Sequence, residues 1–217
     1  MVKPTIALFL HHPECSQDCV DGMTQSLSKH YKIKTFGVDE CNASTFNKAD
    51  IIAFPGGIGD ASSYDTFFRR KAQNAVAEYV EHKGRYLGIC MGAYWAGSYY
   101  FDLLDGLEPV QYIKRPNSDI KRSYGTVAPV TWNGESENIF FYDGCALIGD
   151  SKKFDTIATY ANGDAAAIIQ GRVGLIGPHP ESTKHWYETP YQYIEQHWHN
   201  GHHHSLLLDF VDKLLQS

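Results

Sequence analysis

The chain has 217 residues, of which 43% are hydrophobic and 20% are charged, and its formal net charge is -6 at pH 7. This composition is typical of a globular protein with a sizeable core, and it argues against a disordered or membrane-spanning chain. The negative charge provides no basic surface for nucleic acid or an anionic membrane. We therefore expect a small neutral or zwitterionic ligand as the partner.

The beginning of the chain and its cysteines indicate the compartment. The apolar run TIALFL (5–10) is too short for the apolar region of a signal peptide or for a spanning helix. Five cysteines at irregular spacing favour free thiols over a disulfide framework. We expect a reduced, cytoplasmic protein with a single domain over residues 1–217, and the sequence leaves its oligomeric state open.

The first half of the chain alternates predicted strands and helices. Short apolar runs that end in glycine or proline indicate buried strands, and apolar residues at helical spacing indicate the helices between them. The predicted strands are residues 5–10, 31–38, 49–57 and 85–90, and the predicted helices are residues 20–31, 65–83 and 91–101. This alternation is typical of a parallel sheet covered on both faces, and right-handed crossovers make it doubly wound.

The second half has a different pattern. Short extended runs are separated by turns rich in Asn, Gly and Asp, which predicts an antiparallel addition and a return to the sheet. An amphipathic helix closes the chain. The extended runs are residues 125–132, 138–144, 156–161, 165–170 and 172–177, and the closing helix is residues 206–215.

The segment GICMG (88–92) passes from a predicted strand into a predicted helix. A sharp turn of this kind presents its central side chain at the carboxyl edge of the sheet, and the glycines are needed because a β-carbon would clash there. A following helix N-terminus favours the thiolate. Cys90 is therefore a candidate nucleophile, although a buried cysteine of the core is the simpler alternative.

The segment GPHPE (177–181) supplies a candidate base. Prolines on both sides of His179 restrict the backbone and therefore the direction of the imidazole. A neutral histidine accepts a proton from a thiol, and a carboxylate such as that of Glu181 holds the ring in the required tautomer. Alone this segment would be interpreted as a loop, but beside the cysteine motif it predicts a Cys-His-Glu triad.

The segment FPGG (54–57) ends another predicted strand. Acyl transfer requires N–H donors for the developing oxyanion, commonly one from the residue after the nucleophile and one from a neighbouring strand-to-helix loop. Met91 and Gly57 occupy these positions. The alternative is a turn with no other role.

Together these three motifs resemble the class I glutamine amidotransferase-like superfamily. Within it the chain is most similar to the amino-terminal domain of eukaryotic-type biotin-protein ligases and their stand-alone bacterial homologues, through residues 54–65, 84–98, 130–135 and 163–181. The resemblance implies an α/β fold with a flavodoxin-like, doubly wound, mostly parallel sheet and a small antiparallel addition in the C-terminal half. It implies Cys90 as nucleophile, His179 as general base and Glu181 as third member, with Gly57 and Met91 at the oxyanion.

The resemblance has one notable departure. Glutaminases of this superfamily usually continue the cysteine motif with a glutamine, whereas Ala93 and Tyr94 follow here. The expected activity is hydrolysis of a small carboxamide or amino-acid-like amide through a thioester, without a cofactor or metal. The alternatives are a non-catalytic ligand-binding or regulatory module of the biotin-protein ligase type, and a cysteine peptidase or thiol enzyme of the PfpI/DJ-1 type.

Further residues are candidates for ligand or metal contact. Gly56, Tyr64 and Tyr94 are expected near the ligand. The histidines within residues 197–204 could bind a metal, but they lie in a turn that fixes no ligand geometry. His11, His12, Cys15 and Cys19 could hold zinc, although a rim of thiols and imidazoles around the cleft is the favoured interpretation.

Overall fold

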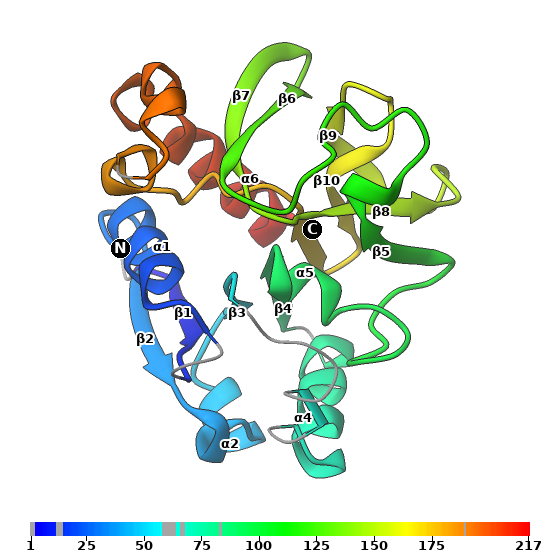
Figure 1. The fold of residues 1–217 in the computed structure, drawn as a ribbon. Helices are drawn as coiled ribbons and strands as arrows, with labels where there is room; N and C mark the ends of the chain where they lie inside the picture. The colour runs from blue at the N-terminus through cyan, green and yellow to red at the C-terminus, as the bar shows by residue number, and fades with distance from the viewer. Residues whose placement is uncertain (1–2, 12–14, 58–63, 66–67, 83, 189) are drawn as a thin grey trace.

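The computed structural model describes residues 3–11, 15–57, 64–65, 68–82, 84–188 and 190–217. Within these residues, five parallel strands form one part of the sheet: β1 (Thr5–Phe9), β2 (Lys32–Phe36), β3 (Ile51–Phe54), β4 (Arg85–Ile89) and β11 (Val173–Ile176). Their spatial order, β2-β1-β3-β4-β11, is that of a flavodoxin-like doubly wound sheet (Figure 1). This arrangement confirms the fold class predicted from the sequence.

Six antiparallel strands in the described part of the chain extend the sheet beyond β11. They are β5 (Leu107–Gln111), β6 (Thr126–Trp132), β7 (Glu135–Phe141), β8 (Cys145–Gly149), β9 (Asp155–Tyr160) and β10 (Ala165–Gln170). The order continues β10-β9-β6-β7, while β8 pairs with both β10 and β5. The addition is larger than expected because the sequence did not reveal β5 and β8. Pro109 lies within β5, and proline is typical of edge positions rather than of a regular strand.

Helices cover both faces of the parallel strands (Figure 1). α1 (Gln17–Leu27) contacts α6 (His203–Gln216) on one face, and α2 (Ala43–Phe46) contacts α4 (Arg70–Glu81) on the other. The helix predicted over residues 65–83 is α4, which begins later than expected. Arg69 has extended backbone angles, so α4 is separate from the helical residues Tyr64 and Asp65 that precede it. Residues 66–67 and 83 lie outside the described chain.

The helix after the cysteine motif is short. α5 spans Met91–Tyr94, whereas the sequence predicted a helix over residues 91–101. Beyond it the N–H groups of Ala96 and Gly97 donate to Ala93 O and Tyr94 O, three residues earlier, which tightens the turn. The chain then folds back so that Phe101 packs against Trp95 in the core. Tertiary packing of these two aromatic side chains therefore ends the helix.

Aromatic side chains form the core on the α4 side of the sheet. Phe54 lies at its centre, with its ring within 5.1–6.1 Å of those of Phe9, Trp95 and Phe101. Tyr64 is buried in the same cluster, where its ring contacts Phe68, Trp95, Tyr100 and Phe101. No described helix is both long enough and apolar enough to cross a membrane.

Candidate functional site

Cys90 occupies a strained turn at the carboxyl end of β4. Its backbone angles are φ 50° and ψ -105°, and its N–H donates to Ile176 O of β11 over 2.8 Å. A residue with a β-carbon rarely adopts positive φ, and such strain persists only where the surroundings enforce it. The elbow expected from the sequence is therefore present, and the side chain of Cys90 leaves the sheet edge from it.

Two glycines allow this turn to form. A β-carbon on Gly88 would lie 2.4 Å from Gly92 O, and one on Gly92 would lie 1.9 Å from Phe54 O. Both contacts are with backbone atoms, which cannot move aside without opening the sheet. The N–H of Gly92 also donates to Pro55 O over 3.2 Å, which ties the elbow to the loop after β3. The spacing of glycines in the sequence thus reflects steric exclusion.

His179 and Glu181 follow β11, the parallel neighbour of β4. The Nδ1 atom of His179 lies 2.8 Å from Glu181 Oε1, and the His179 N–H donates to Phe140 O over 2.7 Å. Both residues are buried: 3% of the surface of His179 and 0% of that of Glu181 is exposed. Because neighbouring parallel strands end at the same edge, the fold brings this pair to the cysteine elbow.

The Cys90 thiol lies close enough to the imidazole of His179 to help raise the pKa of His179, and both residues line the same cavity. Burial alone would lower the pKa of His179, but the negative charges of Glu181 and Cys90 and hydrogen bonds with the thiols outweigh it. These contacts hold the pKa of His179 well above its ordinary value. The Cys90 thiol also donates to Tyr142 O over 3.5 Å, and 6% of the residue is exposed. The three members of the expected triad are therefore adjacent.

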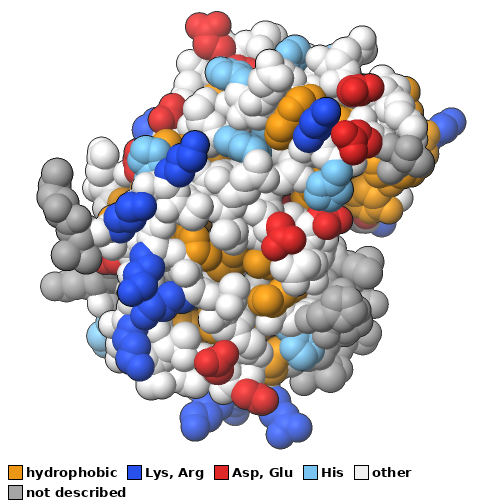
Figure 2. Space-filling view, turned by 90° about the vertical axis from the view of Figure 1, so that its left-hand side faces the viewer, with side chains coloured by type: hydrophobic (Ala, Val, Ile, Leu, Met, Phe, Trp, Pro, Cys, Tyr) orange, Lys and Arg blue, Asp and Glu red, His pale blue; other side chains and the backbone are white. Residues whose placement is uncertain are grey.

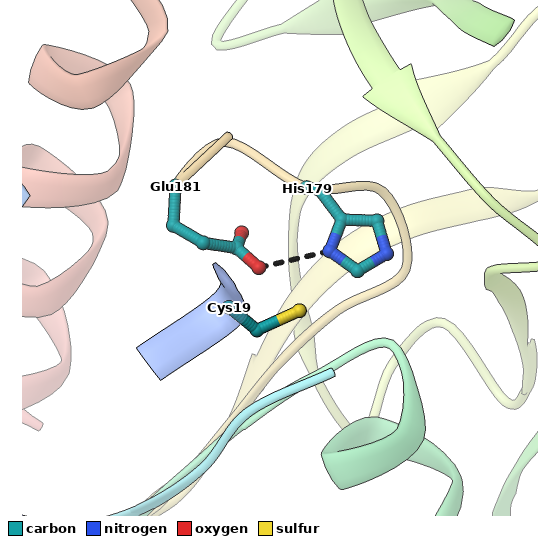
Figure 3. A group of neighbouring side chains, drawn as sticks. All are labelled: Cys19, His179 and Glu181. Carbon is teal, nitrogen blue, oxygen red and sulfur yellow. Dashed lines mark hydrogen bonds and ion pairs between the residues drawn. The ribbon is translucent and has the colours of Figure 1, made fainter. Parts of the chain in front are cut away.

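A second thiol contacts the same imidazole. Cys19, the third residue of α1, directs its sulfur towards His179 and Glu181 (Figure 3). Burial raises the pKa of Cys19 to about 11, against the opposing hydrogen bond from His179. Gly56 lies beneath this contact: a β-carbon there would be 2.7 Å from His179 Cε1 and 2.8 Å from Cys19 Sγ. The sequence placed Cys19 at the rim of the cleft but did not reveal its contact with the histidine.

Cys90, Cys19 and His179 face a cavity of about 420 Å³, within the usual range for small-molecule sites. Aromatic side chains form much of its wall, and Asp18 and His185, 3.4 Å apart, add a carboxylate and a second imidazole. The lining residues are Ser16, Asp18, Cys19, Gly57, Cys90, Phe140, Tyr142, His179, His185, Trp186, Pro190 and Tyr191. The aromatic wall was not expected, because its members come from β7, the residue after it and the turns before α6.

The two expected oxyanion donors lie on the adjoining loops. Gly57 lines the cavity and pairs with Cys15 in an isolated bridge, and Met91 begins α5 directly after Cys90. The hydrogen bond from Gly92 to Pro55 joins these loops. Their backbones are therefore held side by side next to the thiol.

The three expected ligand contacts have other neighbours. Gly56 is buried beneath His179, and Tyr64 belongs to the aromatic core. Tyr94 donates its hydroxyl proton to Asp143 O over 3.2 Å and is half-buried. Burial raises the pKa of the Tyr94 hydroxyl. None of the three is among the residues that line the cavity.

The histidines of the histidine-rich segment do not all share one partner, and His203 is buried. His202 contacts Glu137 at 3.1 Å, while His203 and His204 lie near Ser182 O. Figure 2 shows histidine side chains scattered over one face of the molecule, most of them in its upper half, and lysines and arginines in a row along its left edge. The other zinc hypothesis concerned His11, His12, Cys15 and Cys19. Cys15 is buried and its thiol donates to Phe9 O, and His12 lies outside the described residues.

Comparisons with known proteins show which family and which fold the chain resembles. Residues 11–105 match the family model described as "Biotin-protein ligase, N terminal". No curated protein sequence matches the chain.

Solved structures share the fold across nearly the whole chain. PurLQS from Thermotoga maritima has a TM-score of 0.69 at 16% identity, covering 98% of this chain and 100% of that one. A second structure, a glutamine amidotransferase, has a TM-score of 0.66 at 14% identity and covers 98% and 99%. A glutamine amidotransferase from Thermotoga maritima has a TM-score of 0.65 at 11% identity and covers 100% of both chains. The resemblance stated from the sequence is confirmed.

Proposed function

Because the chain has the glutamine amidotransferase fold and its residues 11–105 match the biotin-protein ligase amino-terminal model, we propose that it hydrolyses a small carboxamide. Cys90 is the nucleophile, His179 the general base and Glu181 the residue that orients the base. The product is a carboxylic acid, and ammonia is released.

One observation carries this proposal. The Cys90 thiol shares a cavity of about 420 Å³ with His179, and the Nδ1 atom of this imidazole lies 2.8 Å from the buried carboxylate of Glu181. Cys90 also has a strained backbone conformation, with φ at 50°. A core cysteine would require neither the strain nor the ionisable partners, so the arrangement favours a reactive thiol.

The chemistry follows from these contacts. His179 takes the thiol proton as Cys90 Sγ attacks the amide carbon, and the N–H groups of Gly57 and Met91 stabilise the oxyanion. The C–N bond breaks when His179 returns the proton to the leaving nitrogen, which yields ammonia and a thioester on Cys90. Water, activated by the same imidazole, attacks the thioester, and the acid and free thiol are regenerated.

The cavity indicates the class of amide. Its aromatic wall suits an apolar or flat substrate body, while the carboxylate of Asp18 at the first turn of α1 suits a cationic group. An amino-acid-like amide with an ammonium group fits both features. We propose this class as the substrate.

Ammonia release from a panel of glutamine, asparagine and other small amides tests the proposal. We expect turnover by the unchanged protein and a loss of at least about 1000-fold for Cys90→Ala and His179→Ala. Cys41→Ala is the matched control, since Cys41 is buried away from the cavity lining and should retain turnover. Mass spectrometry of the reaction should also detect a thioester on Cys90. Equal rates for the protein and Cys90→Ala would refute the mechanism.

A ligand-binding module is a second candidate, and the residues after the elbow favour it. Ala93 is buried, and the Tyr94 hydroxyl bonds to Asp143 O, so this stretch supplies no amide side chain to the cavity. Such a module would bind an amide saturably without turnover, and its affinity would survive Cys90→Ala. Binding and ammonia release measured on the same samples separate the two functions.

A further inference from the structure

The triad leaves one reactive group of the site unexplained, the thiol of Cys19. Its sulfur, a ring nitrogen of His179 and a carboxylate oxygen of Glu181 all lie within 4.8 Å of one another (Figure 3). They come from the first turn of α1 and from the loop after β11, and all three residues are buried. Among the described residues, this is the group of His, Cys, Asp or Glu side chains close enough to hold a metal ion.

We propose that Cys19, His179 and Glu181 form a binding site for Zn²⁺. Thiolate sulfur, imidazole nitrogen and carboxylate oxygen are the ligand atoms that zinc takes in proteins, at about 2.0–2.3 Å from the ion. Ligand atoms at these distances around a tetrahedral ion lie about 3–4 Å apart, so small side-chain movements are sufficient. The three residues would leave a fourth position for water or a ligand.

A second observation points to a cation at this place. Glu181 is fully buried, and its Oε2 atom has no hydrogen-bond partner among the described residues, although Oε1 is bonded to His179. A buried carboxylate oxygen without a donor is costly, and nearly all such atoms in folded proteins are satisfied. A divalent ion beside the carboxylate would give Oε2 the partner that it lacks.

The surrounding backbone holds the ligands in place. A β-carbon on Gly22 would lie 2.3 Å from Glu181 O, so α1 packs directly on the loop that carries two of the ligands. Gly56 also packs against two of the ligands, since a β-carbon there would lie 2.7 Å from His179 Cε1 and 2.8 Å from Cys19 Sγ. The ligand-bearing elements are therefore close-packed, which favours a defined metal geometry.

Zinc and the triad compete for the same side chains. Metal binding displaces the thiol proton of Cys19, and an ion on the ring nitrogen that faces Glu181 leaves the imidazole proton on the other nitrogen. His179 then has no lone pair to accept the proton of Cys90. We therefore expect zinc to inhibit amide hydrolysis; this consequence rests on the proposed function, whereas metal binding itself does not.

Titration of the metal-free protein with zinc chloride in competition with a chromophoric chelator tests the site. We expect one ion per chain, and affinity weaker by roughly 100-fold in Cys19→Ala and by at least about 10-fold in Glu181→Gln. Cobalt(II) should give a thiolate charge-transfer band that Cys19→Ala removes. Cys90→Ala is expected to lose turnover but to keep both the zinc affinity and the band, which separates this proposal from the proposed function.

Two controls exclude other sites. Cys41→Ala and the double variant His197→Gln/His199→Gln should bind zinc like the unchanged protein. Thermal unfolding without metal verifies that each variant is folded, and zinc should raise the unfolding temperature of the protein but not that of Cys19→Ala. Binding that survives Cys19→Ala, or that disappears with the surface histidines, would overturn the proposal, as would the lack of stoichiometric binding.

Discussion

At the scale of single residues, the site depends on glycines that let neighbouring backbone and side-chain atoms approach closely. Cys90 adopts positive φ because β-carbons are excluded at Gly88 and Gly92. The sequence predicted this turn, since the motif is local and each of its residues has a steric reason. It also predicted Gly56 as a ligand contact, which stays a prediction, but it did not predict that Gly56 lies beneath His179. A glycine that is required by a distant side chain has no local signal.

Gly56→Ala should therefore impair the site more than the fold. The added methyl group would meet His179 Cε1 at 2.7 Å and Cys19 Sγ at 2.8 Å, so both side chains must shift. We expect kcat/KM to fall by about 10–100-fold and the free energy of unfolding to fall by about 1–2 kcal/mol. Gly37→Ala is the control, because its methyl group would meet only Leu10 O at 3.8 Å. Unchanged kinetics in Gly56→Ala would contradict this role.

At the scale of elements, two helices hold the loop that carries His179 and Glu181. α1 presses on Glu181 through Gly22, and α6 begins at His203, whose Nε2 lies 3.2 Å from Ser182 O. The sequence predicted both helices from their apolar spacing, but not this contact. It missed α2 and the end of α5, because four-residue helices carry too little periodicity and because aromatic packing ended α5.

His203 makes the attachment of α6 sensitive to acid. Only 2% of the residue is exposed, and burial lowers the pKa of His203 to about 4. The unfolded chain takes up a proton near pH 6.5 and the folded chain only near pH 4. The neutral histidine therefore contributes stability above pH 6.5 that is lost progressively as the pH falls to 4.

Urea unfolding at pH 7.5 and pH 5 measures this effect. Between these values the unchanged protein should lose about 2 kcal/mol more of its free energy of unfolding than His203→Gln, which has no titrating ring. The exposed His82 provides the control variant, His82→Gln, which should follow the unchanged protein. The same pH dependence in His203→Gln would show that another group is responsible.

At the scale of the whole molecule, the cavity joins the two parts of the sheet. Cys90 and Gly57 come from the parallel part, Phe140 from antiparallel β7, and Trp186 and Tyr191 from the turns before α6. The predicted free thiols are confirmed, since all five cysteines are unbridged and buried. They differ in their access to the cavity, because Cys90 and Cys19 line it and the others do not.

Alkylation of the folded protein should follow this access. Iodoacetamide is expected to modify Cys90 first, because the cavity admits the reagent and His179 accepts the thiol proton. Cys19 should react more slowly, because its pKa is raised to about 11 and little thiolate forms. Burial raises the pKa of both Cys15 and Cys41 to about 12, so they should react only after unfolding, as should Cys145. Peptide mass spectrometry at successive times gives the order, and early modification of Cys41 or Cys145 would contradict it.

The sequence by itself determined the parallel strands, the elbow at Cys90 and the choice of His179 and Glu181 as candidate partners of the thiol. Strands, tight turns and a histidine between two prolines are all encoded by residues that are adjacent in the chain. Only the tertiary structure decided that Cys19 meets His179, that Tyr64 belongs to the aromatic core, and that aromatic residues from the antiparallel part line the cavity. These contacts join residues from distant parts of the chain, and the order of the strands and the packing of α1 and α6 set their distances.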